Sequence, residues 1–331
     1  MKKAVALILA MVMALGMVSA AAQEETFTIG ICQFDGHVAL EESTQGFMDA
    51  ITEVLGDRAI FDEQDAAGEI SLCSTIVNNF VVKDVDLILA NSTPALQTAA
   101  SATYDIPILG TSVTEYGAAL DIADFYGIVG YNVSGTSDLA PLDKQAAMIT
   151  TLFPEAQNVG LLYCSSEANS DYQVKVVSEL LTKAEINVKE FPFMDTSDIA
   201  AVCYAACEFS DVIYVPTDNV VASSAAIVDG VCRPMGVPVI GGDEGICSAC
   251  GVATLCISYY ELGYTTGKMA LRILLDGEDV ATMPIEYAPV FMRLYNSEIC
   301  AELGITPPEE YVEIGTTLPV ETEGIESDTK N

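Results

Sequence analysis

The sequence is poor in histidine and in basic residues. It holds one histidine, His37, and 13 lysines and arginines against 48 aspartates and glutamates, which gives a formal net charge of −35 at pH 7. A chain this acidic repels nucleic acids and anionic membrane surfaces, so we expect neither as a partner. A single histidine also leaves only one imidazole base for Ser-His or Cys-His catalysis.

Signature motifs of common enzyme classes are missing as well. The chain has no G-x-S-x-G, no G-x-x-x-x-G-K-[ST] and no G-x-G-x-x-G segment. These motifs carry a hydrolase nucleophile, a phosphate-binding loop and a dinucleotide site, respectively. We therefore expect no catalytic residues and no cofactor. A secreted enzyme on a two-lobed scaffold stays as an alternative, with His37 as its candidate base.

Cysteine, in contrast, is plentiful, with ten in the chain. Cys32, Cys164 and Cys256 lie in apolar, strand-like runs, where cysteine acts as a small buried hydrophobe. Cys247 and Cys250 form the one close pair with the spacing typical of metal or redox sites. Zinc would need a second pair or nearby histidines. We expect no metal site, and a local disulfide or ordinary packing is the favoured state of this pair.

The first 22 residues predict export from the cytoplasm. Lys2 and Lys3 precede an unbroken apolar run from 4 to 18, and small residues at 19–22 provide a cleavage site before Gln23. This pattern is typical of a secretory signal peptide. A membrane anchor is disfavoured, because about 20 apolar residues are needed to cross a bilayer. We expect a mature, soluble protein that is periplasmic or extracellular.

The remaining chain, about 300 residues, suits two domains. Short apolar, β-branched runs alternate with amphipathic stretches, which is the βαβ pattern of parallel α/β sheets. We expect strands at 26–34, 59–61, 86–90, 107–110, 158–164, 186–193, 211–215 and 237–240. We expect helices at 39–55, 68–82, from 94, 170–184, 197–207, 219–232 and 262–275.

The two halves of this pattern resemble each other. The segment 86–94, an apolar strand that ends in hydroxyl and turn residues, recurs at 211–219, and 106–110 recurs at 237–241. So long a period indicates duplicated domains. The predicted fold class is α/β, with two similar Rossmann-like lobes on parallel central sheets joined by a hinge. The expected lobes are 26–134 plus 260–284 and 135–259 plus 285–315, followed by a disordered acidic tail at 316–331.

Candidate ligand-binding residues lie at the carboxyl ends of the expected strands, where open parallel sheets bind ligands. A helix N-terminus that follows Ser92 and Thr93 can hold a carboxylate, and Asp218 and Glu167 can hold an ammonium group. A small zwitterion such as an amino acid fits both, although Ser92 and Asp218 also suit helix N-caps. The candidate residues are Gln33, Ser92, Thr93, Thr114, Glu115, Glu167, Asn169, Ser170, Thr217, Asp218, Asn219 and Asp243.

Short segments from about residue 27 to 308 carry a family resemblance in their order and spacing. They include I-G-I-C-Q at 29–33, D-L-I-L-A-N-S-T-P at 86–94, E-A-N-S at 167–170 and D-V-I-Y-V-P-T-D-N at 211–219, with further matches at 37–40, 46–50, 106–107, 114 and 260–263. The chain resembles ABC-transporter substrate-binding proteins associated with tryptophan and tyrosine uptake, which have the type I periplasmic-binding-protein fold.

The resemblance implies two lobes that close over one small solute, with permease and ATPase partners at the membrane. It implies ligand contacts for Ser92, Thr93, Thr114, Glu167, Asn169, Ser170, Thr217 and Asp218. The chain departs from the family at Glu115 and Tyr116, where Asp-Pro is frequent, so a bulkier acid and a ring are expected at the pocket rim. Many relatives carry a lipobox cysteine at the cleavage site; this chain lacks one, which implies a freely soluble protein.

We therefore expect an extracytoplasmic, monomeric solute-binding protein of an ABC importer. It would bind an amino acid, aromatic or otherwise, or a similar small zwitterion, and hinge closure would present a closed surface to the transporter. A ligand sensor that signals to a membrane receptor remains an alternative, beside the secreted enzyme.

Overall fold

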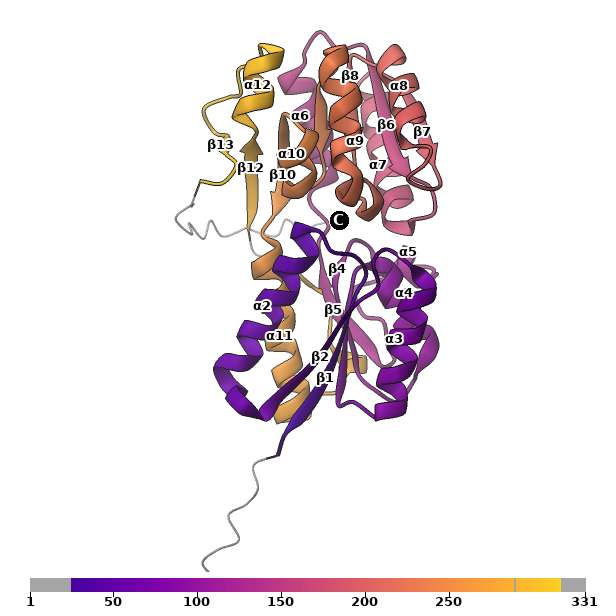
Figure 1. The fold of residues 1–331 in the computed structure, drawn as a ribbon, viewed down its shortest axis with the longest axis vertical. Helices are drawn as coiled ribbons and strands as arrows, with labels where there is room; N and C mark the ends of the chain where they lie inside the picture. The colour runs from indigo at the N-terminus through magenta and orange to yellow at the C-terminus, as the bar shows by residue number, and fades with distance from the viewer. Residues whose placement is uncertain (1–24, 289, 317–331) are drawn as a thin grey trace, which may run out of the picture.

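The structure is a computed structural model that describes residues 25–288 and 290–316. It has two α/β lobes, one above the other, and each lobe has a central sheet with helices on both faces (Figure 1). The expected signal peptide at 1–22, and the expected acidic tail from 317 on, lie outside the described residues. None of the described helices is both long and apolar enough to cross a membrane.

The first lobe holds a six-stranded, parallel sheet in the order β11-β5-β4-β3-β1-β2. Its strands are β1 (Phe27–Gln33), β2 (Ala59–Asp65), β3 (Leu87–Asn91), β4 (Ile108–Val113), β5 (Val133–Ser137) and β11 (Glu286–Tyr287). Its helices are α2 (Val38–Leu55), α3 (Ile70–Lys83), α4 (Thr93–Ala102), α5 (Tyr116–Ala119) and α11 (Tyr259–Asp276). Short 3-10 turns lie at Gly56–Arg58 and Val280–Thr282.

The second lobe holds a seven-stranded sheet in the order β13-β12-β10-β9-β8-β6-β7, in which only the β10–β12 pair is antiparallel. Its strands are β6 (Asn158–Cys164), β7 (Asn187–Phe193), β8 (Val212–Val215), β9 (Val239–Gly241), β10 (Ala253–Ile257), β12 (Phe291–Tyr295) and β13 (Val312–Glu313). Its helices are α6 (Leu142–Leu152), α7 (Ala168–Lys183), α8 (Ile199–Phe209), α9 (Asn219–Met235), α10 (Glu244–Cys250) and α12 (Ser297–Leu303).

Strand β1 shows why the central strands are apolar on both faces. Ile29 and Ile31 pack with α2 and α11 residues on one side of the sheet, and Cys32 packs with α3 residues on the other. All three side chains are fully buried. A parallel strand covered by helices on both faces reads as a continuous apolar run rather than as an alternating one.

Helices α2 and α11 lie side by side because glycines remove side chains between them (Figure 1). A Cβ added at Gly263 on α11 would lie 1.9 Å from the Ser43 carbonyl oxygen on α2. A Cβ at Gly46 on α2 would lie 2.1 Å from the Tyr260 carbonyl oxygen on α11. Helix α11, far along the chain, is thereby locked into the first lobe.

The chain crosses between the lobes after β5, after β10 and after β11. Residues 135–137 belong to β5 and residues 286–287 to β11, and both strands lie in the first sheet. The sequence analysis assigned these residues to the second lobe. No strand was predicted at 133–137, but β5 is a buried strand, and its Thr136 hydroxyl bonds to Thr111 within the sheet and to Thr266 on α11.

We predict that Gly263→Ala destabilises the protein by roughly 2–3 kcal/mol, because the new methyl group must push α2 and α11 apart. Gly230 on α9 is the matched control, since it is exposed and a Cβ there meets no atom within 4 Å. Gly230→Ala should stabilise the protein by about 0.5–1 kcal/mol through helix propensity. Urea unfolding of both variants measures the difference, and equal effects would contradict the packing argument.

Candidate functional site

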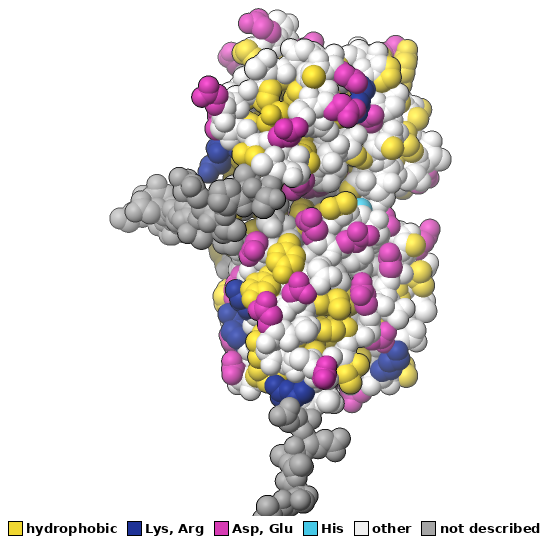
Figure 2. Space-filling view, turned by 60° about the vertical axis from the view of Figure 1, so that its left-hand side comes forward, with side chains coloured by type: hydrophobic (Ala, Val, Ile, Leu, Met, Phe, Trp, Pro, Cys, Tyr) yellow, Lys and Arg dark blue, Asp and Glu magenta, His cyan; other side chains and the backbone are white. Residues whose placement is uncertain are grey.

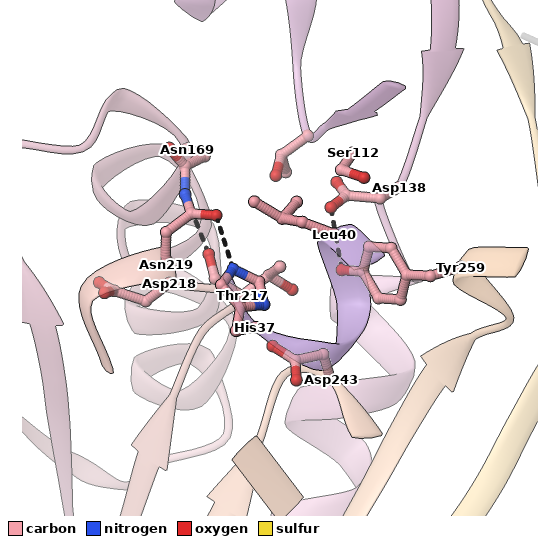
Figure 3. A pocket seen from close by; sticks show the side chains of 11 residues that line it. His37, Leu40, Ser112, Asp138, Asn169, Thr217, Asp218, Asn219, Asp243 and Tyr259 are labelled. Carbon is pink, nitrogen blue, oxygen red and sulfur yellow. Dashed lines mark hydrogen bonds between the residues drawn. The ribbon is translucent and has the colours of Figure 1, made fainter. Parts of the chain in front are cut away.

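A cavity lies between the lobes, at the carboxyl ends of both sheets (Figure 3). We call it the interlobe cavity. Its volume is about 10 Å³, room for about one water molecule, so an amino acid enters only when the lobes or side chains move apart. Leu40 points into the space among the polar side chains. The lining residues are His37, Leu40, Ser112, Thr114, Asp138, Asn169, Thr217, Asp218, Asn219, Asp243 and Tyr259.

Half of the residues predicted from the sequence line this cavity. They are Thr114, Asn169, Thr217, Asp218, Asn219 and Asp243. The strand-end rule found them because the two sheets point their carboxyl ends at each other. Glu167 lines a neighbouring cavity instead, and Gln33, Ser92, Thr93, Glu115 and Ser170 are not among the lining residues.

Five lining residues were not among the candidates: His37, Leu40, Ser112, Asp138 and Tyr259. His37 N-caps α2 directly after β1, Ser112 is in β4, and Asp138 follows β5. The same strand-end rule applied to β5 would have found Asp138. Asp138 was missed because no strand was predicted directly before it.

The first lobe contributes hydroxyl groups without protein partners. The hydroxyl oxygens of Ser92, Thr93 and Ser112 are buried and make no hydrogen bond within the described part of the chain. Strand β3 pairs with β4 through Asn91 and Thr111, so Ser92 and Ser112 follow neighbouring positions. Ser92 has φ 110° and Ser112 has φ 53°, conformations that L-residues rarely adopt. Backbone strain of this kind collects at binding sites, where the surroundings enforce it.

Asp138 and Tyr259 connect two of the crossings between the lobes. The Tyr259 hydroxyl donates a hydrogen bond to Asp138 Oδ2 at 3.0 Å, as Figure 3 shows. Asp138 Oδ1 is buried and makes no hydrogen bond. Burial raises the pKa of Asp138 to about 6, against the opposing effect of the nearby Thr114 and Tyr259 hydroxyls. We call the crossings at Asp138 and Tyr259 the hinge. One carboxyl oxygen of the hinge, Asp138 Oδ1, thus belongs to a residue that lines the cavity and has no hydrogen-bond donor among the described residues.

Glu167 and Asp218 together hold the N-terminus of α9. Glu167 accepts hydrogen bonds from the Asn219 and Val220 backbone N–H groups at 3.2 and 3.0 Å, and from the Asn219 side chain at 2.6 Å. Asp218 accepts from the Cys164 and Val221 N–H groups at 2.7 and 2.9 Å. Most of these oxygens already accept hydrogen bonds from the start of α9 or from β6. The two carboxyl groups therefore hold the site residues in place and leave few free acceptors for a ligand.

The carboxyl groups around the cavity hold their protons to unusually high pH. Burial, followed by the charge of Asp218, raises the pKa of Glu167 to about 8. Burial also raises the pKa of Asp243 to about 7 and raises that of Asp218. No lysine or arginine is among the residues that line the interlobe cavity to offset these charges. The unliganded site therefore favours neutral acids, whereas a bound cation would favour carboxylates.

Other predicted residues serve the scaffold. Gln33 accepts a hydrogen bond from Thr44 at 2.7 Å, and Ser170 donates one to Asp218 at 2.8 Å. Glu115 caps α5 by accepting from the Ala118 N–H group. Tyr116 was expected at the pocket rim, but its ring is buried in the first-lobe core and its hydroxyl donates to the Thr136 carbonyl oxygen at 3.0 Å. Although Tyr116 departs from the family pattern, its ring is therefore not among the residues that line the cavity.

Direct contacts hold the two lobes together beside the cavity. His37 Nε2 lies 3.2 Å from Asn219 Oδ1, a contact drawn in Figure 3. The Ser223 hydroxyl donates to an Asp35 carboxylate oxygen across the same gap. Burial lowers the pKa of His37, so its ring is neutral at neutral pH and can donate through Nε2. These bonds are available only when the lobes are together.

The family is decided by comparison with known proteins. A family model described as ABC transporter substrate binding protein matches residues 28–317. The chain belongs to the ABC transporter substrate-binding proteins. A tyrosine-binding protein of Clostridioides difficile (strain R20291) is 35% identical over 260 residues, which cover 78% of this chain and 75% of that protein. The family and the two-lobed fold expected from the sequence are thus confirmed.

Two solved structures are similarly identical in sequence to this chain but superpose on it to different degrees. A Streptococcus pneumoniae ABC domain in complex with L-Trp is 30% identical, with a TM-score of 0.83, covering 87% of this chain and 99% of that one. The ligand-free, open structure of a Clostridium difficile substrate-binding protein is 34% identical with the same coverage, yet its TM-score is 0.67. Sequence identity does not explain the lower score. This substrate-binding protein therefore superposes better on the tryptophan complex than on the open structure.

We predict that the free energy of unfolding of the ligand-free protein falls as the pH rises from 5 to 8. Asp138, Asp243 and Glu167 have raised pKa values, so the folded state keeps protons that the unfolded state loses near pH 4. The folded state therefore loses stability as these groups ionise, by an amount on the order of 2 kcal/mol for one such group. Urea unfolding at several pH values measures this slope.

Asp243→Asn provides the matched variant for this measurement. Its amide oxygen keeps the N-cap acceptor that bonds the Ile246 N–H group, but the side chain no longer titrates. The slope should decrease in this variant and stay unchanged in Asp143→Asn, which alters an exposed carboxylate on α6. A flat wild-type profile would contradict the assignment.

Proposed function

We propose that this substrate-binding protein binds an aromatic L-amino acid, tyrosine or tryptophan, between its lobes. One observation carries the proposal. Among the buried polar atoms without partners, the hydroxyl groups of Ser92, Thr93 and Ser112 follow strands of the first lobe or lie in them, and two acceptors, Asp138 Oδ1 and Asn169 Oδ1, belong to residues that line the interlobe cavity. Buried polar groups are normally hydrogen-bonded, so these atoms indicate a polar ligand. Two relatives are named for tyrosine binding or hold L-Trp, which supports the same class.

The ligand carboxylate is assigned to the first lobe. Ser92, Thr93 and Ser112 offer three buried hydroxyl donors, and α4 begins at Thr93. Helix N-termini offer free backbone N–H groups and a favourable dipole to an anion. The lining of the interlobe cavity has no arginine, whose guanidinium group often binds a carboxylate through two hydrogen bonds. Hydroxyl and backbone N–H donors would bind the ligand carboxylate instead.

The ligand ammonium is assigned to Asp138 and Asn169. Asp138 Oδ1 and Asn169 Oδ1 are buried acceptors without a donor, and both residues line the interlobe cavity. Asp218 and Asp243 line the same cavity and add negative potential. An ammonium group has three N–H donors, so it satisfies both orphan oxygens and stabilises the ionised form of Asp138.

The aromatic ring is assigned to a second cavity between the lobes, which we call the outer cavity. Its volume is about 290 Å³, and Phe34, Ile70, Pro94, Met194 and Val220 provide its apolar lining. Val220 of the outer cavity follows directly on Asn219 of the interlobe cavity along the chain. The other lining residues are mostly polar or charged, among them Asp35, Glu69 and Asp195, so we expect the ring to pack on the apolar side chains.

The closed lobes are the form that we expect to meet the transporter. A ligand that bonds to both lobes favours closure by its higher affinity for the closed state. Partners would be a membrane permease and an ATPase, and the binding protein would act after export as a soluble monomer. The distribution of carboxylates over both lobes, with few basic side chains among them, suits a soluble surface (Figure 2).

We predict micromolar or tighter binding of L-tyrosine or L-tryptophan in isothermal titration with refolded, ligand-free protein. Tyramine lacks the carboxylate and 3-(4-hydroxyphenyl)propionate lacks the ammonium group, so each should bind at least tenfold more weakly. Asp138→Asn should weaken amino-acid binding by roughly 10- to 100-fold, since a charged hydrogen bond contributes about 1.5–3 kcal/mol. Asp143→Asn on the exposed face of α6 is the control and should bind normally.

Two results would overturn this assignment. One is no heat signal with any aromatic amino acid from protein shown to be folded and free of ligand. The other is equal affinity for tyrosine and tyramine, because the hydroxyl cluster would then not hold a carboxylate.

We also predict that the affinity for the amino acid rises between pH 5 and pH 7.5. The pKa values of Asp138 and Asp243 are about 6 and about 7, so at low pH binding must first remove protons from them. Titration in buffers of different ionisation enthalpy should show proton release on binding near pH 6. Asp138→Asn should reduce this release, and binding without proton exchange would contradict the electrostatic argument.

A further inference from the structure

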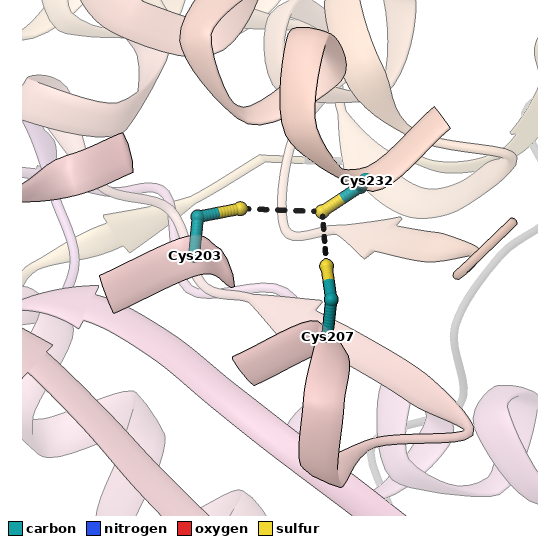
Figure 4. Close-up of side chains that lie close together, drawn as sticks. All are labelled: Cys203, Cys207 and Cys232. Carbon is teal, nitrogen blue, oxygen red and sulfur yellow. Dashed lines mark hydrogen bonds between the residues drawn. The ribbon is translucent and has the colours of Figure 1, made fainter. Parts of the chain in front are cut away.

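Three cysteine side chains meet inside the second lobe, away from the binding site. Cys232 Sγ on α9 lies 3.3 Å from Cys203 Sγ and 3.5 Å from Cys207 Sγ, both on α8 (Figure 4). The three sulfurs all lie within 4.8 Å of one another. We call these residues the thiol cluster. The sequence analysis singled out Cys247 and Cys250 instead, because nothing in the spacing of the three reveals that α8 packs on α9.

The surroundings of the thiol cluster are apolar. Its three side chains are between 0 and 7% exposed and pack in a core with Phe191, Ile199 and Val228. The guanidinium group of Arg233 is adjacent in sequence but is paired with Asp229, Glu298 and Glu302. The charge of Arg233 is thus already balanced by carboxylates.

The apolar surroundings decide between two kinds of thiol chemistry. A bound zinc or copper(I) ion would need deprotonated thiols and would leave a net negative centre in the core, which is costly without a partner charge. No fourth histidine, cysteine or carboxylate among the described residues belongs to the group, whereas structural zinc takes four ligands. A disulfide is neutral and removes two polar S–H groups from the core.

We propose that the thiol cluster is a cross-linking site, in which a disulfide joins α8 to α9 through Cys232. Cys232 is the common partner because it contacts both cysteines of α8, so Cys203 or Cys207 remains as a thiol beside the disulfide. That remaining thiol can attack the bond and exchange with it. The lobe therefore has two alternative cross-links of the same helices.

The oxidant is a small-molecule or protein disulfide. Cys207 is the most exposed of the three, and hydrogen bonds with Cys203 and Cys232 lower its pKa against the opposing effect of burial, so its thiol is the first to react. Its thiolate attacks one sulfur of the external disulfide and releases one thiol. Cys232 then loses its proton, attacks Cys207 Sγ and releases the second thiol. Two protein thiols are oxidised, and one external disulfide is reduced to two thiols.

The test is a disulfide map of the full-length protein after equilibration with oxidised glutathione. Trypsin leaves all three cysteines in one peptide, but cleavage after Glu208 separates Cys207 from Cys232, and cleavage after Tyr204 separates Cys203 from Cys207. Non-reducing mass spectrometry should find the α8 peptide joined to the α9 peptide. The oxidised protein should melt about 5–10 °C above the reduced protein.

Variants make the outcome specific. Cys203→Ser and Cys207→Ser should each keep one cross-link, whereas Cys232→Ser should lose it. Cys250→Ser is the control, since Cys250 is buried in the same core but outside the thiol cluster. Three free thiols in oxidised, folded protein would overturn the proposal. So would one equivalent of zinc or copper(I) bound by the reduced protein and lost in Cys232→Ser, because the cluster would then be a metal site.

Discussion

The central constraint on this protein is the presence of several buried carboxyl groups around one small space whose lining holds no lysine or arginine to balance them. Asp138, Asp218 and Asp243 line the interlobe cavity, and Glu167 lies directly behind it. Burial raises the pKa of each group. Ionisation with the lobes together therefore costs free energy that a bound ammonium group offsets. Ligand charge and lobe closure are consequently linked through the same groups.

This linkage explains how one small solute can change the arrangement of two large lobes. The hydrogen bonds that join the lobes directly, such as that between His37 and Asn219, each contribute little net free energy in water, and a small apolar cluster that includes Ala39, Ile257 and Phe291 adds to them. A ligand that satisfies donors in one lobe and acceptors in the other adds several charge-assisted hydrogen bonds that exist only in the closed form. The lobes of this chain lie together, since His37 contacts Asn219 and Ser223 bonds to Asp35.

Much of the fold follows from local sequence pattern. The repeat of 86–94 at 211–219 predicted two similar lobes, and the aligned residues Asp86 and Asp211 serve the same purpose in both. Each carboxylate accepts a hydrogen bond from the backbone at the start of the first strand of its lobe, at Thr28 and at Asn158. The strand-end rule also predicted six of the eleven residues that line the interlobe cavity, because parallel strands bring their carboxyl ends to one edge of the sheet.

The parts that could not be predicted depend on contacts between distant segments. Asp138 was not among the candidates, since its role depends on β5 joining the first sheet and on Tyr259, which lies at the start of α11 far along the chain. Tyr116 was placed at the rim, but its ring fits the core because Gly110 and Gly135 leave room for its hydroxyl. The thiol cluster likewise exists only through the packing of α8 on α9.

Helix α9 shows how the site and the lobe core can act independently. Its N-terminus, held by Glu167 and Asp218, presents Asn219 to the cavity, and its far end carries Cys232 about 20 Å away along the helix axis. The helix is anchored at one end by hydrogen bonds and along its length by apolar packing. Closure therefore moves α9 with its whole lobe rather than within it, so ligand selection depends on how well two preformed faces meet. A cross-link at Cys232 would strengthen the lobe without altering the face that meets the ligand.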